Sequence, residues 1–232
     1  KSYRRMTLPT YPFQRKRYWI ETDHQTLKTS DSKQRLAPRL PLEQWFYHRT
    51  WQRMTLPSPT KLSHKKYLIF TDNERTTWKT ALGNQPQNLI TVSLDNLFKE
   101  ISPHNYLINR HNLDTIEQLF TSLAANTWTP DHVIYAWPME CRKMDQALKI
   151  ALPGLIILLK NLASQAKSTK LSVIASGTQH VLGNESLNPA LASLMGPILV
   201  APQEYQQLHC QLIDITAEDL QDKIPLIVKS FA

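Results

Sequence analysis

The amino-acid sequence predicts an α/β fold, in which helices cover both faces of a doubly wound, mostly parallel sheet. Short apolar runs that suit buried strands alternate along the chain with longer segments of helical spacing. Residues 171–215 read strand, helix, strand, which is the repeating unit of a helix-covered parallel sheet. Hydrophobic residues make up 41% of the 232 residues, so a sizeable core can form.

Five apolar runs predict the strands, because each is short, rich in branched or aromatic residues, and bounded by polar ones. They are residues 67–71, 89–93, 133–137, 171–176 and 208–215. The helices are predicted from apolar residues spaced three and four apart. They are residues 74–82, 112–125, 145–166, 190–195 and 219–231.

Proline and glycine predict where these helices end or bend. Gly83 ends the first helix. Pro153 is expected to kink or restart the long helix over 145–166, because proline has no backbone N–H to donate. Gly196-Pro197 is expected to stop the short helix over 190–195, since glycine permits a helix end and proline does not continue the helix.

Charge divides the chain into two parts. The net charge is +8, but residues 1–66 hold 15 Lys and Arg against 4 Asp and Glu, and the remainder holds 12 against 15. The basic character therefore belongs to an N-terminal arm, and the globular part is mildly acidic. We expect an extended strap over residues 1–21, a polar, flexible linker over 22–42 and a folded domain over 43–232.

Aromatic and basic residues alternate in the arm, and Pro9 and Pro12 break any helix there. Its rings must therefore dock on another surface or stay exposed. Such a composition also suits single-stranded nucleic acid, where rings stack on bases and cations neutralise phosphates.

The arm resembles the linker that follows the acyltransferase domain in modular type I polyketide synthases. The Tyr-Pro-Phe-x-Arg-x-x-Tyr-Trp pattern of that family is matched without departure. It falls on Tyr11, Pro12, Phe13, Arg15, Tyr18 and Trp19. The resemblance implies a strap that lies across the acyltransferase and returns to the ketosynthase. It favours docking through these six residues over nucleic-acid binding.

The sequence lacks the motif of a usual dinucleotide site. Such a site needs glycines after the first strand, because the backbone must approach the pyrophosphate at a helix N-terminus. Here the turn reads Thr71-Asp72-Asn73-Glu74-Arg75, with two carboxylates and no glycine. We therefore expect no cofactor-binding residues in this chain and no binding of NADPH.

No other pattern predicts catalysis or a metal site. None of the eight Tyr has the Lys or Asn four positions later that a short-chain reductase pairs with its proton donor. His104 and His111 are expected in solvated loops. Ser176 and His180 share a loop but lack a third orienting group at matching spacing. The two cysteines lie far apart and are expected to be buried thiols.

Residues 43–232 resemble the structural subdomain of a polyketide synthase ketoreductase, a truncated Rossmann-like copy that has lost its cofactor site. The family pattern is a Gly-x-Gln turn after a strand, then Gly-Pro, Pro-Gln-Glu, and a closing strand that ends in Asp. It falls on Gly177, Gln179, Gly196, Pro197, Pro202, Glu204 and Asp214. The family also places a short aromatic segment at the entrance of this region. Here it comprises Trp45, Phe46, Tyr47 and Trp51.

The resemblance implies a non-catalytic part of a cytoplasmic multienzyme. Its partners would be the upstream ketosynthase–acyltransferase domains and the downstream ketoreductase catalytic subdomain. NADPH and phosphopantetheine-linked substrates would bind elsewhere in the parent protein. We expect the aromatic segment, together with Leu226 and Phe231 of the last helix, to contact that catalytic subdomain.

Neither a nucleic-acid nor a membrane partner is expected, and the apolar run over 151–159 is too short to cross a bilayer. The first residue is Lys1, which predicts a piece of a longer polypeptide. Three alternatives stay open. They are a vestigial ketoreductase half kept as a scaffold, a nucleic-acid module with a basic arm, and an independent α/β enzyme with an unrecognised site.

Overall fold

The computed structural model of the protein describes residues 41–44, 50–55, 65–72, 75–83, 86–141, 143–216 and 220–231. Two compact units divide the chain, residues 1–50 and residues 51–232. The first unit contributes one described element, the 3-10 helix η1 (Leu42–Gln44). The strap over 1–21 and the aromatic residues Trp45, Phe46 and Tyr47 lie outside the described residues.

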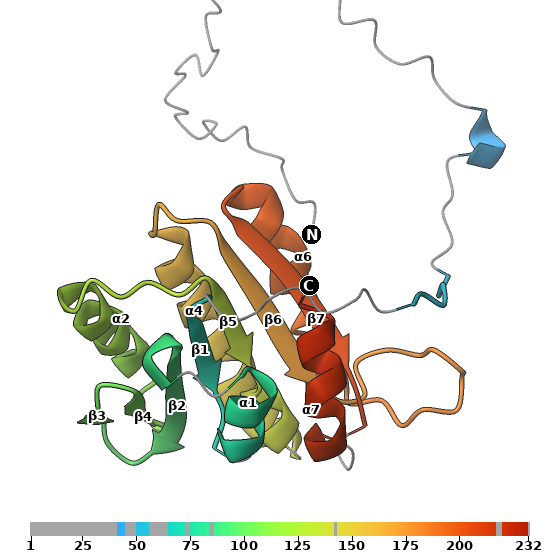
Figure 1. Ribbon diagram of the computed structural model, residues 1–232. Helices are drawn as coiled ribbons and strands as arrows, with labels where there is room; N and C mark the ends of the chain where they lie inside the picture. The colour runs from blue at the N-terminus through green and yellow to red at the C-terminus, as the bar shows by residue number, and fades with distance from the viewer. Residues whose placement is uncertain are drawn as a thin grey trace, which may run out of the picture. The chain divides into compact units, whose positions relative to one another are not determined.

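A seven-stranded sheet forms the centre of the second unit (Figure 1). In chain order the strands are β1 (Tyr67–Phe70), β2 (Leu89–Asp95), β3 (Lys99–Ser102), β4 (Asn105–Asn109), β5 (His132–Tyr135), β6 (Thr169–Ala175) and β7 (Leu208–Asp214). They lie in the order β3-β4-β2-β1-β5-β6-β7, and all neighbours are parallel except β3 and β4. From β4 to β7 this is the strand order of the Rossmann fold, so the predicted fold class is confirmed.

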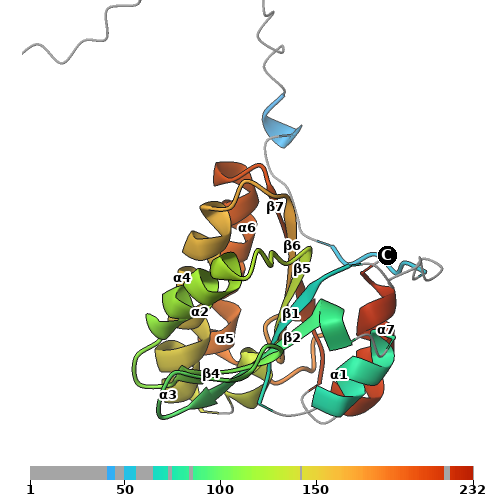
Figure 2. The same ribbon diagram turned by 60° about the vertical axis from the view of Figure 1, so that its left-hand side comes forward.

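Helices cover both faces of the sheet (Figure 2). On one face lie α1 (Arg75–Ala81) and α7 (Leu220–Lys229), and on the other lie α2 (Thr115–Ala125), α4 (Leu152–Ala163), α5 (Pro189–Ala192) and α6 (Met195–Glu204). Every residue of β1 and β5 is buried, because apolar side chains of these strands alternate between the two faces. Each face therefore has its own core.

All five predicted strands are present, but the hairpin of β3 and β4 was missed. Its strands read KEIS and NYLIN, and only Tyr106 and Ile108 are buried. A strand at the edge of a sheet needs few apolar residues, so its sequence resembles a polar loop. His104 lies in the turn of this hairpin and His111 in the turn after β4, so both are loop histidines as expected. His111 is exposed, but the Nδ1 atom of His104 is buried, so the expectation of a solvated ring was wrong for His104.

Pro153 restarts the long helix, as predicted. The helical run consists of α3 (Met144–Gln146), a π-helical turn (Ala147–Ala151) and α4, with Pro153 near the start of α4. The wider turn accommodates the proline ring, and the buried Tyr135 hydroxyl donates to the Ala151 carbonyl at 2.9 Å. The whole run, Met144–Ala163, is long and apolar enough to span a membrane by composition, contrary to the expectation from 151–159. The core helix of a water-soluble protein meets the same criterion.

The prediction that Gly196-Pro197 ends a helix was wrong. The short helix α5 ends at Ala192, and Gly196 and Pro197 lie in the first turn of α6, which begins at Met195. Proline is compatible with the first turn of a helix, because the N–H groups there have no partner within the helix. The same pair of residues therefore begins the helix that leads to β7.

Candidate functional site

The carboxyl ends of β1, β5, β6 and β7 meet at one edge of the sheet, here called the carboxyl edge. In open α/β sheets, ligands bind at this edge, where the strand order reverses. The reversal here lies between β1 and β5, since β2 follows β1 on one side and β5 lies on the other. The candidate site is therefore built from the turn after β1 and the loops after β5 and β6.

The chain's own carboxylates occupy the turn after β1. A 3-10 helix, η3 (Trp137–Glu140), follows β5 and places the Glu140 carboxylate against this turn. Glu140 accepts a hydrogen bond from the Asp72 backbone N–H at 2.9 Å. The Asp72 carboxylate in turn accepts from the backbone N–H of Leu94. A dinucleotide fold uses such N–H groups for the pyrophosphate, whereas here an internal anion takes that of Asp72.

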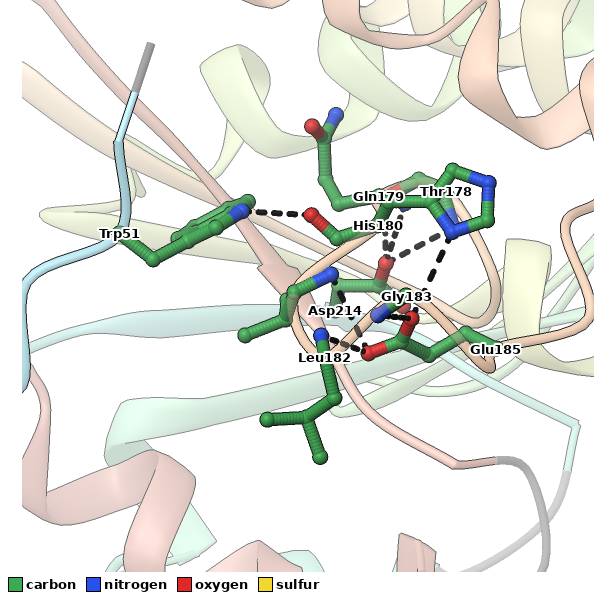
Figure 3. A network of polar contacts seen from close by, with 9 residues as sticks. Trp51, Thr178, Gln179, His180, Leu182, Gly183, Glu185 and Asp214 are labelled. Carbon is green, nitrogen blue, oxygen red and sulfur yellow. Dashed lines mark hydrogen bonds and ion pairs between the residues drawn. The ribbon is translucent and has the colours of Figure 1, made fainter.

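A second carboxylate organises the loop after β6 (Figure 3). Asp214, the last residue of β7, accepts hydrogen bonds from the backbone N–H groups of Gly177, Thr178 and Gln179, each at 2.8 Å. It also accepts from the Thr178 hydroxyl at 2.8 Å. Gly177 has a φ of +68°, and a Cβ there would lie 2.7 Å from the Ser186 carbonyl oxygen. Only glycine fits this turn without strain.

Glu185 holds the outer part of the same loop (Figure 3). Its carboxylate accepts hydrogen bonds from the backbone N–H groups of Val181, Leu182 and Gly183 at 3.1, 2.6 and 2.9 Å. These bonds, that of Leu182 above all, lower the pKa of Glu185 to about 2. The His180 ring nitrogen Nδ1 lies 3.5 Å from the same carboxylate. Two carboxylates therefore fix six backbone N–H groups between residues 177 and 183.

Trp51 contacts this loop from the start of the second unit. Its indole N–H donates to the His180 carbonyl oxygen at 2.6 Å, although 59% of the side chain stays exposed. Val181 and Leu182 are also exposed, Leu182 to 84%. Exposed apolar side chains on a loop with fixed backbone are typical of a contact surface for another protein unit. We call Trp51, Val181 and Leu182 the loop surface.

Two open cavities lie beside this loop, of about 460 and 380 Å³. Cys141, Met144 and Ser176 line the larger one. Burial raises the pKa of the Cys141 thiol to about 11, so the thiol stays protonated near neutral pH. In the described part of the chain, no hydrogen bond joins Ser176 to His180, and no group of three potential metal ligands occurs.

Comparison with known proteins identifies the family. The model of the family described as "Beta-ketoacyl synthase-like, N-terminal" matches residues 65–230, most of the chain. The chain belongs to this family. It is also 30% identical over 156 residues to the polyketide synthase PksM of Bacillus subtilis (strain 168), covering 60% of this chain. It spans only 3% of the length of that relative.

Two solved structures with the same fold come from modular synthases. One is an adenylation, ketoreductase and pseudo Asub multidomain structure of a keto acid-selecting NRPS module, with a TM-score of 0.65 and 17% identity over 76% of this chain and 16% of that one. Another is an A-type ketoreductase from a modular polyketide synthase, with a TM-score of 0.53 and 14% identity over 78% of this chain and 36% of that one. The resemblance of the globular part to the ketoreductase region of a modular polyketide synthase is therefore confirmed.

The sheet brings together some of the motif residues predicted from that resemblance. Gly177, Gln179 and Asp214 meet in one hydrogen-bonded turn, and the Gln179 side chain contacts the Met195 sulfur at 3.3 Å. Gly196 and Pro197 follow Met195 at the start of α6, whereas Pro202 and Glu204 lie in its last turn. The motif thus ties the loop after β6 to both β7 and α6.

Sequence reasoning missed two carboxylates that hold the loops at the carboxyl edge, Glu140 and Glu185. Glu140 reaches the turn after β1 only because β5 lies next to β1 in the sheet. Glu185 had a weak local signal, since it follows Gly183 by two residues in a loop whose N–H groups have no partner in a helix or strand. A carboxylate two or three residues after a glycine-containing turn can accept hydrogen bonds from the backbone N–H groups of that turn.

The expected contact of Phe231 with a following domain is not met, because Phe231 is buried within the chain. Its ring packs edge-on against His132 at 4.3 Å between centroids, and Lys170 Nζ donates to its carbonyl oxygen at 3.2 Å. These residues lie at the amino ends of the strands, here called the amino edge. The apolar residue at the end of this helix is thus buried against its own domain. Leu226 on the same helix is 42% exposed.

Proposed function

We propose that this chain is a non-catalytic structural subdomain and linker of a polyketide synthase module. It positions and stabilises the ketoreductase catalytic subdomain and connects it to the ketosynthase–acyltransferase part. The observation that carries the proposal is the occupied carboxyl edge, where Glu140, Asp72, Asp214 and Glu185 accept hydrogen bonds from its loops. In related folds ligands bind at this edge, whereas here these backbone N–H groups donate to carboxylates of the same chain.

The chain itself is proposed to bind no cofactor. An NADPH pyrophosphate at the turn after β1 would displace Glu140 from the Asp72 N–H and approach two carboxylates. At 4 Å, two like charges at a protein surface repel by about 4 kcal/mol. NADPH and phosphopantetheine-linked substrates are assigned to other parts of the parent protein, which is proposed to be cytoplasmic.

The loop surface is the proposed contact with the catalytic subdomain. Trp51 extends the aromatic segment that the family places at the entrance of this region, and it is bonded to the loop after β6. The residues of the strap, with Trp19 and Phe13 as its largest rings, are proposed to dock on the upstream domains. Neither assignment calls on a nucleic acid.

Reconstitution with the catalytic subdomain of the same parent protein tests the proposed role. Mixing the two pieces should protect backbone amides of residues 51–55 and 180–185 from hydrogen exchange. β1 and β5 should be protected already in the chain alone, because they are fully buried.

Trp51→Ala should weaken the association, while Met54→Ala, an exposed apolar control in the same segment, should not. Equal protection of residues 51–55 and 180–185 with and without the partner would remove the positioning role.

A further inference from the structure

Lysines gather at the amino edge, around the starts of β1, β5 and β6. Among the described residues that lead into these three strands, Asp131 is the one acidic residue. Residues 67–232 as a whole hold 12 Lys and Arg against 15 Asp and Glu, so positive charge is not a general property of this domain. We call four of these residues the lysine cluster. They are Lys65, Lys66, Lys167 and Lys170.

The fold holds the lysine cluster around a single carboxylate. Asp131 forms an ion pair with Lys167 at 2.6 Å and accepts a hydrogen bond from the Lys66 backbone N–H at 2.8 Å. Burial, and the charge of Lys65 nearby, lower the pKa of Lys170. Within the part of the chain that the structure describes, no carboxylate forms an ion pair with Lys65, Lys66 or Lys170. The cluster therefore carries an excess of positive charge at fixed positions.

The spacing of the cluster matches that of an α-helix. Since β5 lies between β1 and β6, the lysines at the start of β1 and those at the start of β6 lie two strand spacings apart, about 10 Å. Seven residues of an α-helix advance by about 10.5 Å and complete two turns, so side chains seven residues apart lie on the same face. A helix laid across the three strands can therefore present one carboxylate to each pair of lysines.

The chemistry of the cluster favours carboxylates over nucleic acid. It contains lysine and no arginine, whereas the planar arginine group makes the bidentate contacts that are typical of phosphate and base recognition. Trp128 is a half-buried ring beside the cluster, but Lys66 Nζ lies over it at 5.8 Å from the ring centroid. This face of the ring is therefore not free to stack on a base.

We propose that the lysine cluster is a docking surface for an acidic helix of another protein domain, which lies across the amino ends of β1, β5 and β6 with carboxylates seven residues apart. Opposite charge speeds the encounter, and the two pairs of lysines set the orientation of the helix. The amino edge and the loop surface lie at opposite ends of the strands, so the proposal is independent of the proposed contact with the catalytic subdomain.

Binding of designed helical peptides to the full chain, measured by fluorescence anisotropy, tests this proposal. One peptide carries glutamates seven residues apart on an alanine-rich helix. Its isomer has the same composition, but its glutamates are five residues apart and so point to different sides of the helix. The first peptide should bind more tightly than the isomer, and its binding should weaken as salt is added.

Charge reversal locates the contact on the chain. Lys65→Glu with Lys167→Glu should raise the dissociation constant of the first peptide by about tenfold, because attraction becomes repulsion at both ends of the cluster. Lys143→Glu with Lys223→Glu makes the same change in net charge at exposed lysines outside the cluster, and should leave the dissociation constant within about twofold. Urea unfolding checks that each variant is folded.

A milder variant covers the case in which a second carboxylate beside Asp131 prevents folding. Lys65→Gln with Lys167→Gln should raise the dissociation constant by about threefold. Equal binding of the two peptides, or equal effects of the two charge reversals, overturns the proposal, since the attraction then depends on net charge or on the basic N-terminal arm. It is also overturned if a thymidine oligonucleotide or phosphatidylserine vesicles bind the cluster more tightly than the first peptide does.

Discussion

The two edges of the sheet hold their neighbouring segments with opposite kinds of side chain. At the carboxyl edge, Asp214 and Glu185 accept hydrogen bonds from backbone N–H groups of the loop after β6. At the amino edge, Lys170 donates to the carbonyl oxygen of Phe231, and His132 packs against its ring. At the carboxyl edge, the chain's own carboxylates thus occupy positions where a ligand binds in related folds. At the amino edge, Lys170 and His132 hold the end of the last helix.

The difference predicts different responses to acid. His132 must stay neutral to remain buried, and burial, with Lys170 and Lys65 nearby, lowers its pKa to about 3. Glu185 must stay charged to hold its loop, and its pKa is about 2. Both contacts weaken in acid, but the amino edge weakens first.

The largest expected effect is the pH dependence from His132. Because its pKa falls from 6.5 in the unfolded chain to about 3 in the folded chain, the unfolded chain binds an extra proton between these values. The free energy of unfolding should fall by about 1.4 kcal/mol for each pH unit below 6.5, down to pH 3. Urea unfolding across this range should show the slope, and His132→Gln should reduce it. An unchanged slope in that variant would refute the assignment.

Asp214→Ala should have the next largest effect. It leaves three backbone N–H groups and the Thr178 hydroxyl without their acceptor. We expect a loss on the order of 3 kcal/mol in the free energy of unfolding, measured by urea denaturation. Asp214→Asn keeps one acceptor oxygen and should lose less. If both variants unfold at the wild-type urea concentration, the carboxyl edge does not depend on this residue.

Gly177→Ala compares a crowded turn with an open one. Gly177 and Gly83 both have positive φ, but a Cβ at Gly83 meets nothing within 4 Å, whereas at Gly177 it meets the Ser186 carbonyl. We expect a loss of about 2 kcal/mol for Gly177→Ala and about 1 kcal/mol for Gly83→Ala. Melting temperatures in the reverse order would contradict the role of the turn.

The smallest effect is expected from Glu185, whose carboxylate lies at the surface. Its folded pKa is below the unfolded value of 4.5, so its contribution is present above pH 4.5 and is lost as the pH falls toward 2. NMR titration should place its pKa near 2, and Glu185→Gln should speed amide exchange at Val181, Leu182 and Gly183 at neutral pH. Unchanged exchange at these three amides would show that the loop is held by other contacts.

The sequence was sufficient for the fold where apolar runs are buried on both faces, as in β1, β5 and β6. It was insufficient for β3 and β4, because an edge hairpin buries few side chains. Gly196-Pro197 gave a wrong prediction because the same dipeptide can end one helix or begin the next. Which of the two occurs here depends on the packing of α6 on β7.

The site was predictable only in part, for a related reason. Gly177, Gln179 and Asp214 came from a family pattern, and the fold explains the pattern as one hydrogen-bonded turn. Glu140 lies 68 residues from Asp72 in the sequence, so its contact depends on the pairing of β1 with β5. Phe231 was predicted to lie at an interface because the last helix is apolar near its end. Instead, His132 and Lys170 contact it from within the same domain.

Calorimetric titration of the chain with NADPH tests most directly the claim that internal carboxylates replace the ligand at the carboxyl edge. The account predicts no saturable heat for the wild-type chain. Glu140→Gln with Asp72→Asn, which removes the two carboxylates that accept hydrogen bonds at the turn after β1, is the matched variant. It should also bind weakly or not at all, since the turn has no glycine and keeps Glu74. One-to-one binding of NADPH by the wild-type chain at micromolar affinity would contradict the account.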